Sequence, residues 1–250
     1  MAGMSDFTLE PPDAATALIG HADAEAALLA AFKSGRLHHA WLIEGPEGVG
    51  KATLAYRFAR FLLSHPDPQA PELALAQDLY VSAEDPVARQ IRARANPDLV
   101  VLQRARDEDG KVTATVITVD AVRRVARFLS TTSATGGWRV VIVDTADDMN
   151  RSSANALLKM LEEPPQLSIF LLLTNTPGRL LPTIRSRCRK LPLKPLPDDT
   201  VAEALRSAGI GADDAARATA ARLSGGSIGK AARLADDDAI ETIRGIHAIL

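Results

Sequence analysis

The chain has 250 residues, of which 46% are hydrophobic, and this is enough to bury a full core and a second, smaller one. Its 29 lysines and arginines nearly balance its 31 aspartates and glutamates, which excludes a whole-molecule field that would draw it onto a polyanion. Any contact with nucleic acid must therefore come from a local patch or from partners. The only cysteine, Cys188, excludes an internal disulfide framework and a metal site that needs two thiolates, and it fits a reducing cytoplasm.

The N-terminus and the apolar runs indicate no membrane role. Met1–Ala15 carries acidic residues and prolines instead of a basic stretch followed by an apolar run, so it does not read as a signal peptide. We expect residues 1–19 to form a flexible leader. The longest apolar runs, such as Ile169–Leu173, are far too short to span a bilayer. The protein is therefore expected to be cytoplasmic.

Beyond the leader, helical and strand patterns alternate. Ala22–Phe32 has Ala, Leu and Phe at helical spacing and stops near Gly35, so a helix precedes the first strand. Near-continuous apolar runs then predict strands that are buried on both faces, and the helical patterns between them predict parallel crossovers. The four predicted strands are Ala40–Ile43, Leu99–Leu102, Val140–Val143 and Ile169–Leu173.

Three further helices are predicted between or after these strands. Apolar residues at helical spacing place them at Lys51–Leu63, at Val119–Leu129 after a Thr118 cap, and at Ser152–Glu162 before two prolines. Two stretches interrupt the alternation. His65–Pro71 is Pro-rich and predicts a loop, and Arg104–Thr115 is charged and predicts a hairpin or an exposed turn.

The composition changes near Leu191–Asp199, where a last strand is expected to run into a linker. Thr200–Leu250 is rich in Ala, Arg and Asp, has helical spacing and shows no strand signal. The predicted fold class is therefore α/β. A mostly parallel sheet flanked by helices is expected over residues 20–196, and a small helical domain over residues 197–250.

The strongest motif, Gly45–Lys51 (GPEGVGK), follows the first predicted strand and ends where a helix begins, which is the context that a phosphate-binding loop requires. Glycines let backbone N–H groups turn around a phosphate, the helix N-terminus adds its positive dipole end, and the lysine adds a point charge. The alternative is a Gly-rich turn that holds no ligand. The residues expected at a nucleotide are Gly45, Gly48, Gly50, Lys51, Ala52, Thr53, and, at later strand ends, Asp144 and Asn175.

One position departs from the pattern of magnesium-dependent ATPases. The residue after the lysine usually carries a hydroxyl that holds magnesium, and here it is Ala52. Thr53 comes next, but one residue further round a helix is about 100° away, which points its hydroxyl elsewhere. The sequence therefore argues against magnesium-dependent hydrolysis.

A second departure lies at the end of the third predicted strand. Asp144 occupies the place where phosphate-loop ATPases put the aspartate that meets the water shell of magnesium. The next residue in such enzymes is usually a glutamate that orients the attacking water, and here it is Thr145, whose hydroxyl cannot act as a carboxylate base. Asp147 and Asp148 are expected to cap or precede the next helix.

Arginines gather after the fourth predicted strand and a short helix that is predicted from about Gly178. The segment Ile184–Cys188 (IRSRC) carries two of them, and an arginine suits the γ-phosphate of a neighbouring subunit because its guanidinium is always charged and donates in a planar fork. Such a finger, supplied in trans, accelerates hydrolysis on the order of 10³–10⁵-fold, or roughly 4–7 kcal/mol. The alternative, which charge alone favours, is a solvated basic face made of Arg179, Arg185, Arg187, Arg189 and Lys190.

With these residues together, the chain resembles the clamp-loader branch of the AAA+ family. The similarity covers about residues 20–195 and rests on Arg36–Ala40, Asn155–Pro165 and Ser186–Cys188, in order and spacing. With Thr145 in place of the catalytic glutamate, the chain resembles the delta prime subunits of bacterial DNA polymerase III more than the ATPase gamma or tau subunits. The resemblance implies a helical lid domain, a role in DNA replication, and gamma/tau and delta subunits, a sliding clamp and primed DNA as partners.

The resemblance also implies roles for single residues. Arg187 would act in trans at an adjacent gamma or tau ATP site, and Asn175 matches the sensor 1 region. Gly226–Gly229 looks like the sensor 2 segment, in which Gly229 stands where ATPase members carry an arginine and Lys230 is adjacent. His65–Asn96 holds no cysteine where bacterial relatives carry a zinc module, so no zinc is expected.

Relatives also end in a helical collar domain, which this chain is expected to lack, and a truncated chain of this kind is expected to be monomeric in isolation. Three functions follow from these patterns. The first is a non-hydrolysing assembly subunit of the clamp loader. The second is an autonomous phosphate-loop ATPase of the loader or remodelling type, and the third is an adaptor that binds ATP or ADP without hydrolysis.

Overall fold

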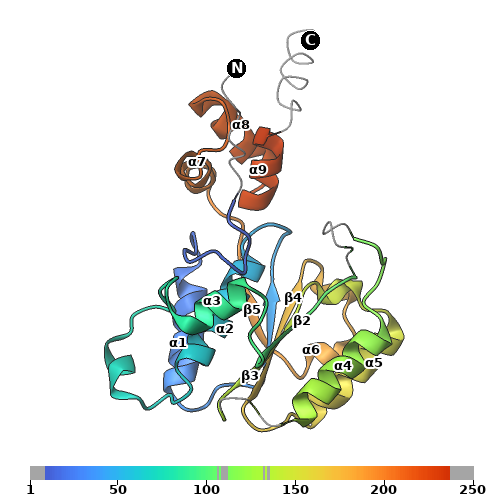
Figure 1. Ribbon diagram of the computed structural model, residues 1–250. Helices are drawn as coiled ribbons and strands as arrows, with labels where there is room; N and C mark the ends of the chain where they lie inside the picture. Colours follow the sequence, from blue (N-terminus) through green and yellow to red (C-terminus); the bar gives the residue numbers. More distant parts are fainter. Residues whose placement is uncertain (1–8, 106, 108–111, 132, 134–135, 237–250) are drawn as a thin grey trace.

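Five parallel strands form the centre of the structure (Figure 1). The computed structural model describes residues 9–105, 107, 112–131, 133 and 136–236. The strand order is β2-β3-β4-β1-β5, and every residue of β3 and β4 is buried, as near-continuous apolar runs predict. The strands are β1 (Ala40–Glu44), β2 (Leu99–Leu102), β3 (Arg139–Val143), β4 (Ser168–Thr174) and β5 (Arg189–Pro192).

The four predicted strands are therefore confirmed to within one residue at each end. The fifth begins at Arg189, two residues before the composition change that predicted it. Arg189, Lys190 and Pro192 are exposed, and only Leu191 within it is buried, because β5 is an edge strand that pairs with β1 alone. An edge strand of this kind lacks the apolar run that marks the central strands.

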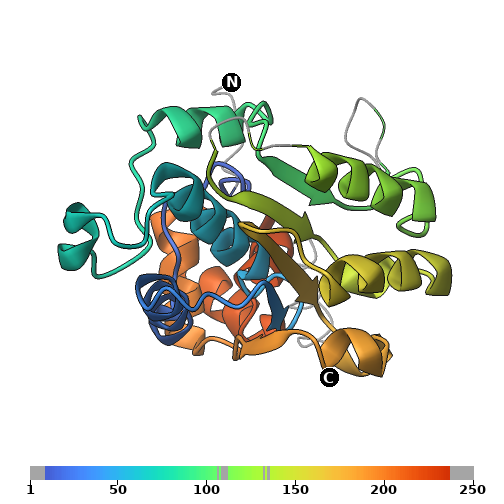
Figure 2. The same cartoon turned by 90° about the horizontal axis from the view of Figure 1, so that it is seen from below.

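Helices cover both faces of the sheet, as Figures 1 and 2 show. One face carries α1 (Ala22–Lys33), α2 (Lys51–Ser64) and α3 (Pro86–Arg92), and the other carries α4 (Val119–Ser130), α5 (Arg151–Glu162) and α6 (Pro182–Arg185). Side chains alternate along β1, so Trp41 and Ile43 enter the first core while Leu42 enters the second. The sheet is thus the middle of three layers with an apolar core on each side.

The stretch from residue 65 to residue 96 contains a helix that the sequence pattern did not predict. Helix α3 begins after Asp85, whose carboxylate accepts hydrogen bonds from the backbone of Val87 (2.8 Å) and Ala88 (3.4 Å). Pro86 at its first position needs no hydrogen-bond donor there. An Asp-Pro pair is a known helix start, and it was the signal available in the sequence.

Two further expectations concern loops. The short helix expected from about Gly178 is a 3-10 turn at Pro177–Arg179 followed by α6. The stretch from 104 to 115, expected as a hairpin or exposed turn, lies partly outside the described residues. Its flanks are joined by a backbone hydrogen bond from Thr113 to Ala105 (2.8 Å).

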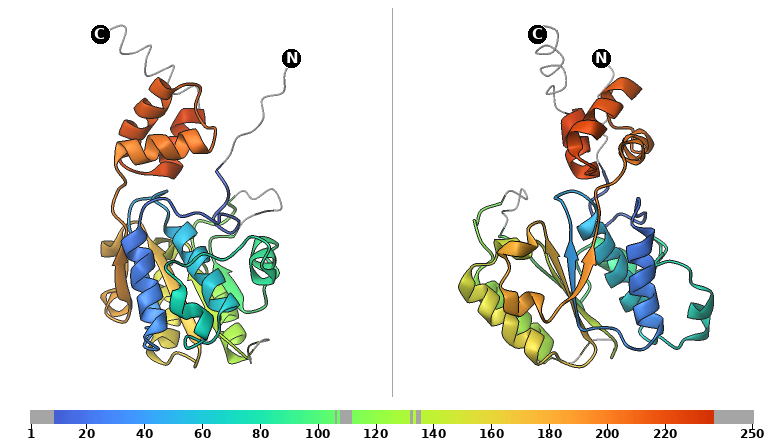
Figure 3. Two further views of the ribbon diagram at one scale, coloured as in Figure 1. Left: turned by 90° about the vertical axis from the view of Figure 1, so that its left-hand side faces the viewer. Right: turned by 180° about the vertical axis from the view of Figure 1, so that it is seen from behind.

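A small helical lid follows the sheet. It consists of α7 (Asp198–Ser207), α8 (Asp214–Ser224) and α9 (Ile228–Asp236) and is joined to β5 by residues 193–197 (Figure 3). Val201, Leu205 and Ala220 form its own apolar core. Within the described part of the chain, no helix is long and apolar enough to cross a membrane.

The described part of the expected leader, residues 9–19, is held against α2. The guanidinium of Arg57 pairs with Glu25 and donates to the carbonyl of Thr16, and that of Arg60 donates to the carbonyls of Asp13 and Ala15. Both arginines are less than a tenth exposed. Buried guanidinium groups need such acceptors, so the segment and the helix stabilise each other.

The turn between α8 and α9 places two glycines with positive φ side by side. A Cβ at Gly226 (φ +80°) would lie 2.6 Å from the backbone N and O of Leu196, whereas nothing lies within 4 Å of a Cβ at Gly225 (φ +62°). Gly226 therefore allows a close approach of two backbone segments as well as a turn.

Gly226→Ala is accordingly expected to destabilise the protein by about 2–4 kcal/mol, because backbone atoms must move as well as adopt a strained φ. Gly225→Ala, the matched control, is expected to cost only about 1–2 kcal/mol of left-handed strain. Urea unfolding followed by circular dichroism measures both. Equal losses for the two variants would contradict the close approach.

Candidate functional site

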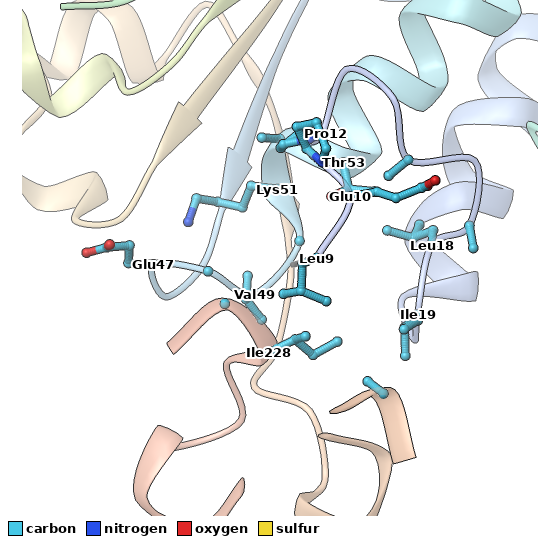
Figure 4. A pocket seen from close by; sticks show the side chains of 18 of the residues that line it. Leu9, Glu10, Pro12, Leu18, Ile19, Glu47, Val49, Lys51, Thr53 and Ile228 are labelled. Atoms are coloured by element: carbon cyan, nitrogen blue, oxygen red, sulfur yellow. The ribbon is translucent and has the colours of Figure 1, made fainter. Parts of the chain in front are cut away.

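The candidate site lies where the carboxyl ends of the central strands meet. Because β1 lies between β4 and β5, and β4 lies beside β3, the loop after β1, Asp144 after β3 and Asn175 after β4 reach the same edge of the sheet. A cavity of about 680 Å³ opens there, a size typical of ligand pockets. Its walls come from the phosphate loop, from residues 9–19 and from the lid (Figure 4).

The structure brings most of the predicted nucleotide-binding residues to this cavity. Those that line it are Gly48, Gly50, Lys51, Ala52, Thr53, Asp144 and Asn175. Gly45 lies at the base of the loop instead, where its N–H donates to the carbonyl of Thr174 (3.2 Å). A Cβ on Gly45 would be 2.6 Å from the carbonyl oxygen of Leu193, so this glycine permits close packing against the chain after β5.

The ammonium group of Lys51 lies at the centre of the site. It is buried and donates to the carbonyls of Gly45 (2.9 Å) and Pro46 (2.6 Å) and to the side-chain oxygen of Asn175 (2.6 Å). These three bonds use all of its donors. Burial lowers the pKa of Lys51, and the nearby carboxylates of Asp144 and Asp147 partly offset that effect.

The N-terminus of α2 offers the backbone donors that a phosphate needs. Its N-cap, Gly50 (φ +112°), provides no side-chain cap, so the first N–H groups of a 14-residue helix have no side-chain acceptor there. Gly48 (φ +72°) also has the left-handed conformation that glycine adopts without cost. The residues present therefore fit a phosphate group.

The same residues do not provide a usual magnesium site. Ala52 presents a methyl group where a hydroxyl would coordinate the ion, and Thr145 places a hydroxyl, not a carboxylate, beside Asp144, to which it donates at 3.3 Å. Across the described residues, no cluster of three or more His, Cys, Asp or Glu side chains is arranged to hold a metal ion.

Asp147 has a role at the site that the sequence pattern did not indicate. Its carboxylate accepts hydrogen bonds from the hydroxyl of Thr174 (2.8 Å) and from the backbone N–H of Asn175 (2.6 Å). It therefore fixes the end of β4 and the residue that holds Lys51. The cap of α5 is Asn150, which accepts from the backbone of Ser153 (2.9 Å), so Asp147 precedes the helix without capping it.

The lid contacts backbone groups of the phosphate loop. Ser227 donates its hydroxyl to the carbonyl of Glu47 (2.8 Å), and the N–H of Gly229 donates to the carbonyl of Gly48 (3.0 Å). A Cβ on Gly229 would lie 3.1 Å from the Cα of Gly48. A glycine where ATPase relatives are expected to carry arginine thus allows the two backbones to meet.

Sequence reasoning missed the arginine of the lid that faces the cavity. Lys230, beside Gly229, is exposed and is not among the residues that line the cavity. Arg233, four residues after Gly229 and hence on the same side of α9, does line it and pairs with Glu47 (3.1 Å). The spacing of four residues between Gly229 and Arg233 was the signal in the sequence that could have identified this arginine.

The arginines after β4 are not a uniform solvated face. Arg187 pairs with Glu162 (2.8 Å) and donates to the carbonyl of Thr183 (3.0 Å). Arg189 lies over the ring of Trp41, 4.9 Å from its centroid. Cys188, between them, packs against the second core, and burial raises the pKa of its thiol to about 12.

Cys188 is therefore expected to resist alkylation in the folded protein. With a pKa of about 12, only about one thiol in 10⁴ is ionised at pH 8, and the thiolate is the reactive form. The rate with iodoacetamide should rise about tenfold per pH unit up to that pKa. Mass spectrometry of native and urea-unfolded protein measures this. Rapid labelling of the native protein at pH 8 would contradict a partly buried, neutral thiol.

Comparisons with known proteins agree with this geometry. A family described as "DNA polymerase III, delta subunit" matches residues 20–197. The subunit delta' of DNA polymerase III from Escherichia coli strain K12 is 38% identical over 211 residues, which cover 84% of this chain and 58% of that protein. The subunit delta' from Pseudomonas aeruginosa is 40% identical over 150 residues, 60% of this chain and 41% of the relative. The chain thus spans about half the length of these relatives.

Among solved structures, the Holliday junction branch migration motor RuvB of Thermotoga maritima has a TM-score of 0.52 and 18% sequence identity. The match covers 94% of this chain and 68% of that chain. At this identity the similarity concerns the fold alone. It confirms the predicted fold class, a phosphate-loop AAA+ fold with a parallel sheet and a helical lid.

Proposed function

The chain belongs to the DNA polymerase III delta-subunit family, in agreement with its resemblance to delta prime subunits, and from this premise we propose that it is a non-hydrolysing subunit of a clamp loader. In this role it helps to place a sliding clamp on primed DNA and supplies Arg187 to the ATP site of a neighbouring gamma or tau subunit. The delta subunit of the clamp loader is a further partner, and the protein acts in the cytoplasm.

One combination of observations carries the proposal. The fold and loop of an ATPase are present, yet the two positions that anchor magnesium and activate water hold Ala52 and Thr145. Loss of one such group commonly costs several powers of ten in rate. The autonomous ATPase, the second reading of the sequence, needs both groups and is therefore disfavoured.

Arg187 is suited to act outside its own subunit. It follows α6, away from the cavity that Lys51 lines, and its side chain is 36% exposed. A guanidinium at a protein surface reaches a partner's phosphate with fixed geometry and permanent charge. These features support a contribution in trans and none to the cavity of its own chain.

A nucleotide remains a fitting ligand for the cavity without being hydrolysed. The backbone N–H groups at the start of α2 and the ammonium of Lys51 would hold its phosphates, and the apolar residues Leu9, Leu18 and Ile228 line the same cavity. Lys51 would exchange at least one of its present acceptors for a phosphate oxygen. We propose ATP or ADP as a retained structural ligand of this kind, and no zinc.

Arg187→Ala tests the main proposal. In a complex assembled from this protein, gamma subunits, clamp and primed DNA, the variant is expected to lower hydrolysis at the adjacent site on the order of 10³-fold. Stimulation of ATP hydrolysis by this subunit should therefore disappear while the complex still forms. Arg179→Ala removes the same charge from the same region and serves as the control. Stimulation that survives in Arg187→Ala would contradict the role in trans.

Calorimetry with ADP tests the ligand. Because Ala52 cannot coordinate magnesium, the dissociation constant should change by less than about twofold when magnesium is added. Lys51→Met should abolish the heat of binding, since the phosphates lose their point charge. Binding that tightens about tenfold with magnesium would argue for an intact metal site.

A further inference from the structure

Glu162 and Arg187 form an ion pair between two elements that the family resemblance treated separately. Glu162 is the last residue of α5, and Arg187 follows α6, which packs beside α5 (Figure 2). Their side chains meet at 2.8 Å, between Nη2 of the arginine and Oε1 of the glutamate. The segment Asn155–Pro165, on which the family resemblance rests in part, thus contacts Arg187, on which the proposed function depends.

The end of α5 is a fixed point from which a carboxylate can act. The carbonyl of Leu161 accepts a hydrogen bond from His39 (3.1 Å), and Pro164 and Pro165 prevent the helix from continuing. A negative charge in the last turn of a helix is unfavourable toward the helix dipole. The pairing with Arg187 offsets that cost, which gives a reason for an acid at this position.

The contacts leave the arginine available. Its Nη1 donates to the carbonyl of Thr183 (3.0 Å), which uses one of the five N–H donors of a guanidinium, and its Nη2 lies 2.8 Å from Oε1 of Glu162 in an ion pair. Within the described residues, the guanidinium makes no other hydrogen bond, and the side chain is 36% exposed. The pair therefore holds one edge of the fork and leaves the rest for a ligand.

We infer that Glu162 is the positioning residue for Arg187, fixing the guanidinium in the orientation that meets a phosphate of the neighbouring subunit. This inference rests on the proposed function. A free arginine loses rotamer entropy when it contacts a phosphate, and an arginine already held against α6 and α5 has lost most of it. Preorganisation of this kind acts on the transition state, where the charge on the transferred phosphoryl group develops.

Glu162→Gln tests the inference in the assembled complex described above. Loss of an ion pair that is about half exposed is expected to lower the kcat of stimulated ATP hydrolysis about three- to fivefold. KM for ATP should stay within about twofold, since Arg187 acts on the chemical step rather than on binding. Glu162→Asp, which keeps the charge, should recover part of the rate.

Glu163→Gln is the matched control, because it removes the same charge from the next residue, which is exposed. The control variant should behave like the wild type. In an Arg187→Ala background, Glu162→Gln should have no further effect, because a positioning residue acts only through the group it positions. Thermal unfolding of each variant excludes a loss of fold as the cause.

The outcomes separate this inference from the proposed function. If Arg187→Ala abolishes stimulation while Glu162→Gln equals the wild type, the inference fails and the proposed function stands. A faster rate in Glu162→Gln would mean that the carboxylate withholds the arginine, which also overturns the inference. If Arg187→Ala has no effect, both fail together.

Discussion

The buried ammonium group of Lys51 is the contact on which the arrangement of the site depends. It joins two carbonyls of the phosphate loop to the side chain of Asn175 at the end of β4. Those two segments are far apart in the sequence and are neighbours only because β1 lies beside β4 in the sheet. Asp147 secures the same strand end through the hydroxyl of Thr174. The parallel sheet therefore determines which polar groups meet at its carboxyl edge.

The residues around this lysine retain the groups that hold phosphates and lack those that activate water. The glycines of the loop and the uncapped start of α2 are in place, whereas Ala52 and Thr145 provide neither a metal ligand nor a base. The lid also differs from what is expected of an ATPase. At the position where ATPase members are expected to carry a sensor arginine, this chain has Gly229, whose N–H donates to the carbonyl of Gly48. These features support the proposal that the chain contributes to catalysis through the groups it presents to neighbouring subunits.

Sequence alone predicted the central sheet and the place of the loop between a strand and a helix well, since both follow from local patterns. Long apolar runs gave β1 to β4, and the position of Lys51 after a strand and before a helix gave the phosphate loop. It did not predict the contacts of Asp147 or Arg233, because each depends on which elements pack together. The pairing of Arg187 with Glu162 could not be predicted either, since the two residues are 25 positions apart with a strand between them.

Under the proposed function, this chain keeps the phosphate-binding loop of an ATPase without the activity. The most direct measurement is the steady-state release of inorganic phosphate by the purified chain alone, with magnesium ATP and without other subunits. We expect no release above the protein-free blank. Magnesium-dependent release that disappears in Lys51→Ala would contradict the account, because it would show that Ala52 and Thr145 do not prevent hydrolysis.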